Sequence, residues 1–269
     1  MKAIKVGIVG CGGRMGRMLV AEVLATPGLR LAAGSEQPGS KLLGQDVAAQ
    51  AGFAAVGARV GADAAALFEA SDVVVDFTTP AATLAHARLA AKTGKALVVG
   101  TTGLGKAQID ALAKAAKKAV VVQAANMSVG VNVLLGLTER VAGLLGPDYD
   151  IEIVEMHHRM KVDAPSGTAL ALGQAAAKGR GVKLEKVSKR VRDGVTGPRK
   201  AGDIGFATLR GGDVAGDHTV VFAGSGERIE LTHKASDRAV FARGAVRAAL
   251  WTRGKKPGLY AMRDVLGFD

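Results

Sequence analysis

The chain has 269 residues, enough for one large domain or two modest ones, and 48% of them are apolar, which suffices for a packed core. Aromatic residues make up only 4%, so aliphatic side chains must build that core. The single cysteine, Cys11, excludes an internal disulfide and fits a reducing cytoplasm, where we expect the protein to reside. No apolar run approaches the roughly 20 residues of a membrane span, and the N-terminus lacks the features of a signal peptide. The net charge of +12 favours anionic partners, either nucleic acid or small polyanionic ligands.

The first half of the chain alternates between short apolar runs and longer helical patterns. The expected strands are 5–9, 29–34, 73–77, 96–100 and 120–124, and the expected helices are 14–25, 80–93 and 106–118. Continuous apolar strands that alternate with helices indicate a parallel sheet covered on both faces.

The pattern changes after about residue 128. Helices are expected at 129–145, 167–177 and 237–251, with strands at 151–156, 219–223 and 228–232. The last helix can return to the first domain. Gly-Asp pairs at 202–203, 212–213 and 216–217 predict turns. Seven basic residues between 178 and 192 have no interleaved aromatics, so we interpret them as a solvated segment rather than a surface for stacking bases.

A glycine-rich turn follows the first strand, in the stretch VGIVGCGGRMGR. Gly10, Gly13 and Gly16 form GxxGxxG rather than the strict GxGxxG, and Gly12 adds room. Such a turn between a strand and a helix lets a pyrophosphate approach backbone N–H groups. The position of this turn favours a dinucleotide site over a plain tight turn.

The residues after the second strand bear on the choice of cofactor. Glu36 lies 20 residues after Gly16, where an acid binds the ribose hydroxyls of a dinucleotide. The next residue, Gln37, is neutral, whereas an arginine would bind a 2′-phosphate. NADH is therefore favoured over NADPH, although Arg14 or Lys41 can substitute for the missing arginine. Two further strand ends, at 76–80 and 100–103, carry small hydroxylated residues and point to the same crevice.

The stretch EMHHRMKVDAPSGT, residues 155–168, concentrates titratable chemistry. It has no metal-binding spacing, so no metal is expected, and no GxSxG elbow for a serine nucleophile. An anion-binding, proton-donating loop remains. The start of a helix can present N–H and hydroxyl donors to a carboxylate, from Ser166, Gly167 and Thr168. Lys161 and His158 add positive charge, while His157 can donate a proton near neutral pH.

The chain resembles the dihydrodipicolinate reductase family, also called the 4-hydroxy-tetrahydrodipicolinate reductases, of bacterial lysine and diaminopimelate synthesis. The resemblance covers nearly the whole chain and includes GCGGRMGR, VVVDFTTP, VVGTTG, AANMSVGVN, IGFATLRGGD, GDHTVVFAG and LTHKASDRAVFARGAVRAALW. Its most specific block is HHRMKVDAPSGT.

The resemblance implies an α/β fold with a Rossmann-like doubly wound parallel sheet and a central mixed α/β domain. The dinucleotide-binding domain would comprise 1–128, joined by 237–269, and the domain for substrate binding and tetramerisation 129–236. The substrate would be a cyclic dicarboxylate, reduced at the expense of NADH or NADPH by a homotetramer that binds neither nucleic acid nor membrane.

The resemblance also implies roles for individual residues. His157 would be the acid, and Lys161 a second proton donor or a charge stabiliser. His158, Gly167 and Thr168 would bind the substrate's carboxylates, with Ser166 beside them. The family's frequent arginine after the ribose acid is replaced by Gln37, and Met127 stands where an aromatic is common. The residues expected to line the cofactor are Gly10, Cys11, Gly12, Gly13, Arg14, Met15, Glu36, Gln37, Gly100, Thr101, Thr102, Ala124, Ala125, Asn126 and Met127.

Two rival interpretations are weighed against this one. The first is another nicotinamide oxidoreductase of similar architecture, such as an aspartate or a semialdehyde dehydrogenase. A semialdehyde dehydrogenase needs a nucleophilic cysteine in the second domain, and the sequence has none there. A nucleic-acid-binding module that kept the dinucleotide fold would bind DNA with an affinity that falls steeply with salt. That second alternative leaves the block at 157–168 unexplained.

Overall fold

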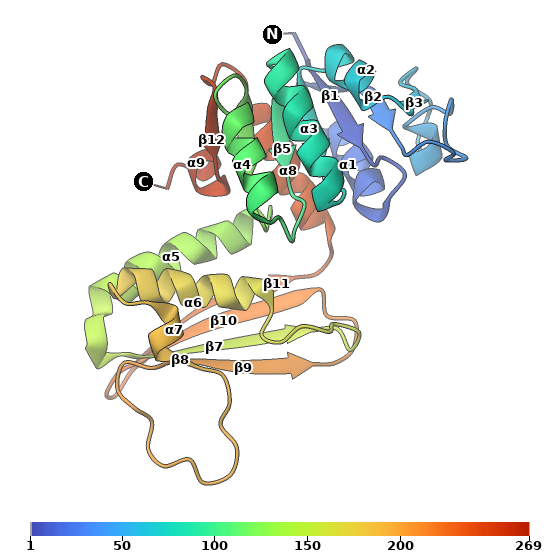
Figure 1. Cartoon of the computed structure of the whole chain (residues 1–269). Helices are drawn as coiled ribbons and strands as arrows, with labels where there is room; N and C mark the ends of the chain where they lie inside the picture. Colours follow the sequence, from blue (N-terminus) through green and yellow to red (C-terminus); the bar gives the residue numbers. More distant parts are fainter. Residues whose placement is uncertain (1, 269) are drawn as a thin grey trace. The chain divides into compact units, whose positions relative to one another are not determined.

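The computed structural model describes residues 2–268, which form two compact units. Unit 1 comprises residues 2–129 and 239–268, and unit 2 comprises Gly130–Arg238. Because the chain leaves unit 1 and later returns to it, the last helix completes the first unit rather than extending the second (Figure 1).

Unit 1 is built on a seven-stranded sheet in the order β12-β6-β5-β4-β1-β2-β3. All its neighbouring strands run parallel. The strands are β1 (Ile4–Val9), β2 (Leu29–Ser35), β3 (Val60–Gly61), β4 (Val73–Asp76), β5 (Ala96–Val99), β6 (Val120–Gln123) and β12 (Gly258–Tyr260). The predicted doubly wound parallel sheet is confirmed. The central strands are apolar throughout because both of their faces are covered.

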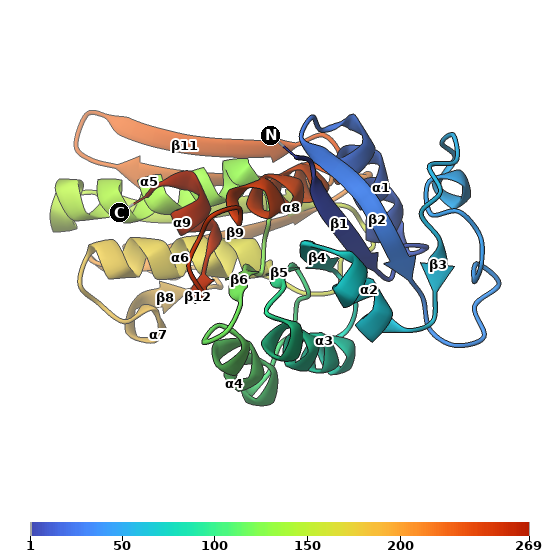
Figure 2. The ribbon, with the colours of Figure 1, turned by 90° about the horizontal axis from the view of Figure 1, so that it is seen from above.

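Helices cover both faces of this sheet (Figure 2). Alternate side chains of one strand enter different cores: Val73 and Val75 pack with α1 and α8, whereas Val74 packs with the helices of the other face. The covering helices are α1 (Arg14–Ala25), α2 (Ala64–Ala70), α3 (Pro80–Thr93), α4 (Lys106–Ala115), α8 (Ala239–Trp251) and α9 (Met262–Leu266). The period-two alternation of a strand therefore divides the apolar residues of unit 1 between two layers.

Unit 2 contains a mixed five-stranded sheet in the order β11-β10-β7-β9-β8. Strand β7 pairs antiparallel with β10 and parallel with β9. The strands are β7 (Asp150–His157), β8 (Ser188–Lys189), β9 (Ile204–Arg210), β10 (Gly216–Ala223) and β11 (Arg228–Ala235). Along β7 buried and partly exposed residues alternate without a break, so one face of the sheet forms the core and the other remains open.

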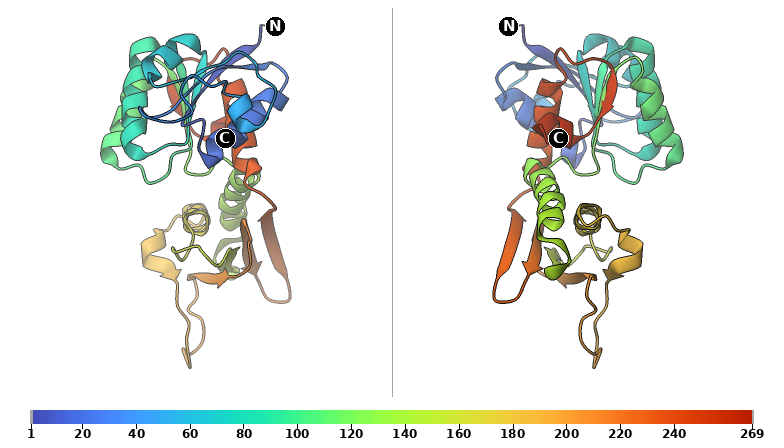
Figure 3. Two further views of the ribbon diagram at one scale, coloured as in Figure 1. Left: turned by 90° about the vertical axis from the view of Figure 1, so that its right-hand side faces the viewer. Right: turned by 90° about the vertical axis from the view of Figure 1, so that its left-hand side faces the viewer.

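The core face of this sheet packs against two long helices, α5 (Val129–Leu145) and α6 (Gly167–Gly179), and the short α7 (Leu184–Val187). Glycines let α5 and α6 approach closely, since a Cβ on Gly179 would lie 2.1 Å from the backbone oxygen of Glu139. The segment between β8 and β9 extends away from the sheet as a long loop (Figure 3). In that loop Val191 is largely exposed and Val195 is fully exposed.

Three local expectations differ from the structure. Helix α4 ends at Ala115 rather than at residue 118, because the N–H groups of Lys117 and Lys118 bond to carbonyls three residues back and tighten the last turn. Gly216 and Asp217 do not form a turn, because they open strand β10 and pair with β11. Strand β9, helix α2 and the short elements β3, β8, α7, β12 and α9 were not expected.

Helix α5 and the turn after it also correct an expectation. Val129–Asp148 is long and apolar enough to cross a membrane by length and mean hydropathy, contrary to the sequence analysis. One such helix is weak evidence for a membrane span. Four of its residues, Val131, Leu134, Thr138 and Ala142, are buried, 22% of the apolar window is buried, and its middle carries the charged residues Glu139 and Arg140.

Candidate active site

The glycine turn joins β1 to α1 at the carboxyl end of the parallel sheet. Gly10 has a φ of +66°, which favours glycine, and its N–H donates to the carbonyl of Ser35 at 2.8 Å. Gly16 has no room for a side chain, because a Cβ there would lie 2.2 Å from the Gly10 oxygen. Two glycines thus make the tight turn and the close helix packing that the motif predicts.

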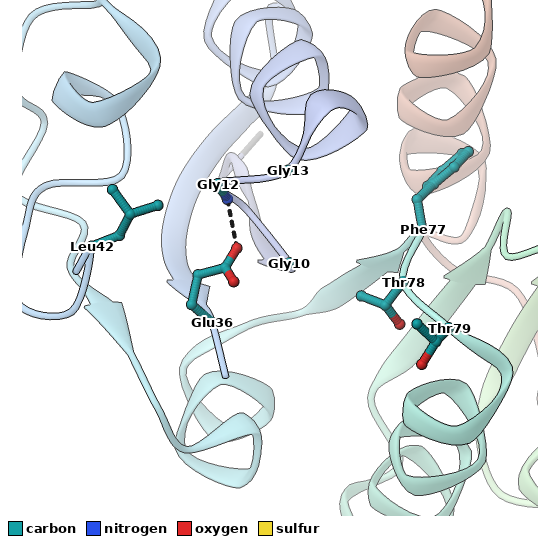
Figure 4. Close-up of a pocket in the computed structure, with 8 residues that line it drawn as sticks. All are labelled: Gly10, Gly12, Gly13, Glu36, Leu42, Phe77, Thr78 and Thr79. Atoms are coloured by element: carbon teal, nitrogen blue, oxygen red, sulfur yellow. Dashed lines mark hydrogen bonds between the residues drawn. The ribbon is translucent and has the colours of Figure 1, made fainter. Parts of the chain in front are cut away.

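An open hollow of about 410 Å³ lies beside this turn (Figure 4). This volume falls in the range of small-molecule pockets, roughly 300–1,000 Å³. Its lining comes from the turn, from the end of β2 and the loop after it, and from the end of β4. The lining residues are Gly10, Gly12, Gly13, Glu36, Leu42, Phe77, Thr78 and Thr79.

Glu36 faces the glycine turn across this hollow. Its Oε1 accepts a hydrogen bond from the N–H of Gly12 at 2.8 Å (Figure 4). A Cβ on Gly12 would meet Leu42 at 2.2 Å, so Leu42 closes over the turn. Gln37, the next residue, is exposed. The acid and the turn therefore share one site, and the neutral side chain beside them is accessible to a ligand.

Asp76 forms hydrogen bonds with residues that follow two neighbouring strands, β4 and β5. Its carboxylate is fully buried and accepts hydrogen bonds from Thr78, Thr83 and Thr101, and from Nδ1 of His86 at 2.8 Å. Burial raises the pKa of Asp76, but His86 and the threonines outweigh it and hold the pKa below its usual value. One buried anion thereby fixes the turn after β4 and the turn after β5.

Other residues expected at the cofactor are placed by the structure in several environments. The side chain of Cys11 is buried in the core against Gly34, and Met127 is also buried there. Thr101 is buried, with its hydroxyl on Asp76, and Gly100 packs against the ring of Phe77. Exposed positions are Arg14, Thr102 and Ala125, and partly exposed ones are Met15, Ala124 and Asn126. None of these ten expected residues is among those that line the hollow.

A second cluster of polar residues lies in unit 2, around the buried carboxylate of Glu155 on β7. Arg210 on β9 donates two parallel hydrogen bonds to it, each at 2.9 Å. The backbone N–H of Ser166 donates to Oε1 at 3.0 Å, and Nδ1 of His157 donates to Oε2 at 2.5 Å. Burial raises the pKa of Glu155, but Arg210 above all lowers it below the ordinary value, so the carboxylate stays ionised.

His157 ends β7 with its ring packed among charged groups. Burial lowers its pKa below the ordinary value, Glu155 opposes that effect, and Lys161 and Arg210 lower the pKa further. The ring makes an edge-to-face contact with His218 at a centroid distance of 5.1 Å. In the ligand-free protein near pH 7 the neutral form of His157 is therefore favoured.

The N-terminus of α6 lies beside this histidine through Ser166. Its Oγ caps the helix by accepting from Ala169 N–H at 3.1 Å and also bonds to His218 Nε2 at 3.1 Å. Ser166 is 2% exposed, whereas Gly167 is exposed and Thr168 partly exposed. A helix N-terminus with accessible donors is suited to a carboxylate. Gly167 and Thr168 form the start of this helix, directly after its cap Ser166.

Lys161 and His158 occupy the loop after β7. Lys161 Nζ pairs with Asp163 at 2.8 Å. The loop is held to the β9–β10 turn, where His158 N–H donates to the carbonyl of Val214 at 2.8 Å, and Arg210 also donates to the carbonyl of Asp163. The charge of Lys161 is thus balanced by Asp163, with which any bound anion would compete.

The structure brings the expected residues into two sites, one in each unit. In unit 1 the glycines and Glu36 meet at the hollow. In unit 2 His157 and Ser166 meet at Glu155. Sequence reasoning missed Leu42, Glu155, Arg210 and His218. Glu155 stands inside the quoted block, so its place two residues before His157 on the same face of a strand was a usable signal.

Comparison with known proteins covers both units. Residues 4–127 match the family described as dihydrodipicolinate reductase, N-terminus, and residues 130–266 match its C-terminus. A 4-hydroxy-tetrahydrodipicolinate reductase of Rhodopseudomonas palustris (strain HaA2) is 55% identical over 267 residues, which cover 99% of this chain and 98% of the relative. The enzyme of the same name from Dinoroseobacter shibae is 55% identical and covers 97% of each chain.

A solved structure shares the fold. The dipicolinate-bound dihydrodipicolinate reductase from Paenisporosarcina sp. TG-14 superposes with a TM-score of 0.78 at 24% identity, covering 96% of this chain and 97% of the other. Together with the matches along both units, these likenesses settle the family. The chain belongs to the dihydrodipicolinate reductase family, the pyridine-nucleotide-dependent oxidoreductases that reduce 4-hydroxy-tetrahydrodipicolinate.

Proposed function

We propose that unit 1 binds NADH in preference to NADPH, and that His157 and Lys161 of unit 2 supply the acid and the charge for reduction of 4-hydroxy-tetrahydrodipicolinate. The observation that carries this proposal is the pairing of two sites, the hollow at Gly12 and Glu36 and the cluster at His157. The reaction belongs to diaminopimelate and lysine biosynthesis.

The hollow fits a dinucleotide. The N–H groups from Gly10 to Gly13 bond within the protein, to Ser35, Glu36 and Gly10. Arg14 and Met15 begin helix α1, whose N-terminus favours a pyrophosphate. Glu36 accepts a hydrogen bond from Gly12 N–H, and this contact beside the turn supports the proposal that its carboxylate accepts hydrogen bonds from the ribose hydroxyls. The bound reduced nucleotide supplies the hydride.

Cofactor preference follows from charge near Glu36. A 2′-phosphate would stand beside this carboxylate and be repelled by it, and Gln37 offers no cation. Arg14 and Lys41 remain the alternative cations for binding a 2′-phosphate. We infer NADH turnover at least equal to NADPH turnover.

The residues of unit 2 act on the substrate. The substrate's C4 hydroxyl leaves as water together with a proton from the neighbouring ring carbon, and a double bond forms between the two carbons. Addition of hydride to a carbon of this conjugated ring then leaves negative charge on the partner atoms. His157 donates a proton from Nε2, because Nδ1 is committed to Glu155. Lys161 stabilises the developing charge once an anion competes with Asp163 for it.

The two ring carboxylates require several donors. Gly167 and Thr168 at the first turn of α6 bind one of them, and His158 contributes positive or hydrogen-bonding character nearby. A doubly negative substrate also raises the pKa of His157, because it offsets the effect of Lys161 and Arg210. Substrate binding thus converts the neutral ring into the acid that the reaction needs.

Assembly and location complete the proposal. The open face of the second sheet carries the exposed Leu209, and the loop between β8 and β9 carries the exposed Val191 and Val195. An apolar open face of this kind favours self-association, and we propose a homotetramer in the cytoplasm that binds neither nucleic acid nor membrane. Light scattering coupled to size-exclusion chromatography measures the mass of the assembly.

The decisive experiment follows the absorbance of each reduced cofactor in the presence of substrate generated in situ by the preceding synthase. Oxidation of NADH at least as fast as that of NADPH supports the proposal, whereas oxidation of neither contradicts it. A semialdehyde dehydrogenase is disfavoured because the chain's only cysteine is buried in the core of unit 1. Salt-dependent DNA binding without turnover would favour the nucleic-acid alternative.

A further inference from the structure

We propose that Glu155 is a positioning residue for proton transfer. It holds His157 with Nδ1 protonated and Nε2 available to the substrate, and it ties that ring to the first turn of α6, where a substrate carboxylate binds. This inference rests on the proposed role of His157 as the proton donor.

The hydrogen-bond arrangement of Glu155 is complete and directional. Oε2 accepts hydrogen bonds from Nδ1–H of His157 and from one guanidinium N–H of Arg210. Oε1 accepts hydrogen bonds from the other guanidinium N–H and from the backbone N–H of Ser166. The residue is 1% exposed, so water does not compete for these four bonds. Paired and fully bonded, the carboxylate is fixed in place rather than free to rotate.

This arrangement dictates the tautomer of His157. A carboxylate can only accept, so the hydrogen between it and the ring must belong to Nδ1. In the neutral ring Nε2 then carries the lone pair, and within residues 2–268 it has no hydrogen-bond partner. Gly216 leaves the space beside Nε2 clear, because a Cβ there would lie 3.0 Å from this nitrogen.

The same carboxylate reaches the substrate-binding helix. Through Ser166 N–H it fixes the residue that caps α6, and Ser166 precedes Gly167 and Thr168 directly. A shift of Glu155 would move the proton donor and the anion-binding turn together. Glu155 therefore sets the spacing between His157 and the first turn of α6. The reacting atom of the substrate must meet the first of these groups while a ring carboxylate meets the second.

Four charged or titratable groups face His157. Glu155 lies on its own strand, Arg210 on β9, His218 on β10 and Lys161 in the loop that follows. Three of them are cationic or can become so, and only Glu155 is anionic. Glu155 is thus the sole group among these four that favours the protonated imidazole.

The test uses the ligand-free, full-length protein labelled with ¹⁵N at histidine, of which the chain has five. In the wild type the neutral ring of His157 should show Nδ1–H and an unprotonated Nε2. In Glu155→Gln its titration should move to lower pH, because the stabilising anion is gone. A wild-type ring with Nε2–H, or a titration that Glu155→Gln leaves in place, would overturn the proposal.

Glu152→Gln is the matched control. Glu152 lies on the same strand but on its other face, where it pairs with Arg192 and Arg199 rather than with His157. The substitution removes the same charge and should leave the His157 titration unchanged. If both variants move it equally, the effect is general electrostatics and the positioning role is refuted.

Kinetics separate positioning from mere support. We expect kcat of Glu155→Gln to fall about 10- to 100-fold, part of what a general acid contributes, with a pH profile moved to lower pH. Glu155→Asp should restore the profile in part, because it restores the anion. An equal loss at every pH in both variants would show a structural role only. Wild-type protein that oxidises no reduced cofactor would refute the proposed function instead, and the tautomer measurement would still stand.

Discussion

The carboxylate of Glu36 accepts a hydrogen bond from the backbone N–H of Gly12, 2.8 Å away across the hollow of unit 1. This contact joins the residue after β2 to the glycine turn, so the acid and the turn form one site. Gln37, the next residue, is exposed, and we propose that a cation there would change the choice of cofactor.

Gln37→Arg should lower the KM for NADPH by about tenfold, because a guanidinium would pair with the 2′-phosphate. Steady-state kinetics with each cofactor measure the change. Lys186→Arg, an exposed substitution on α7, serves as the control for a general effect of arginine. An unaltered KM for NADPH would show that position 37 does not read the ribose.

His157→Ala and Lys161→Ala should each lower kcat by about 100-fold or more, as expected when a proton donor or charge stabiliser is lost. Lys183→Ala removes an exposed lysine outside the cluster and should leave kcat within about twofold of the wild type. Unchanged turnover in both test variants would remove the proposed chemistry from this site.

The pH dependence of kcat/KM should differ from that of kcat. Burial, Lys161 and Arg210 keep the pKa of free His157 below its ordinary value, so kcat/KM falls at comparatively low pH as the acid deprotonates. A dianionic substrate raises that pKa, so kcat should fall only at higher pH. Profiles of kcat and kcat/KM from pH 5 to 9 test which of the two falls at lower pH. A fall of both at the same pH would contradict the prediction.

His218 should make unit 2 sensitive to acid. Burial lowers the pKa of His218 to about 4, below its value of 6.5 in an unfolded chain. As pH falls from 6.5 towards 4 the unfolded state takes up the proton first, and stability decreases by about 3 kcal/mol. Urea unfolding of wild type and His218→Gln at several pH values isolates this contribution. Above pH 7 the free energies of unfolding of the two proteins should change in parallel with pH. Parallel changes over the whole pH range would disprove the contribution of His218.

Asp76→Ala should lower the free energy of unfolding by about 3–5 kcal/mol, because it leaves His86 and Thr83 without their buried acceptor. The pKa of Asp76 is lowered in the folded state, so the stabilisation that its charge provides is present at neutral pH and lost in acid. Thermal unfolding measures the loss, and Asp72→Ala is the comparison. The carboxylate of Asp72 accepts a single hydrogen bond, from the backbone N–H of Lys5. Equal losses would argue against the buried cluster.

Much of unit 1 is predictable because its signals are local. Helices α1 and α3 begin and end where the sequence places them, since Gly13 and Pro80 mark their first turns and apolar residues recur at helical spacing. Strand β9 escaped prediction because its second half, around Leu209, is exposed and lacks regular alternation. Gly216 misled the turn prediction because pairing with β11 overrides local preference.

The sequence by itself determined the parallel sheet, the glycine turn with its acid, and the block from His157 to Thr168, because periodicity and short motifs act over neighbouring residues. Only the tertiary structure decided what surrounds them. Arg210 reaches Glu155 from 55 residues away, and Asp76 gathers Thr101 from the next strand. Such contacts depend on strand order and register, which bring distant side chains onto one face and which no local pattern encodes.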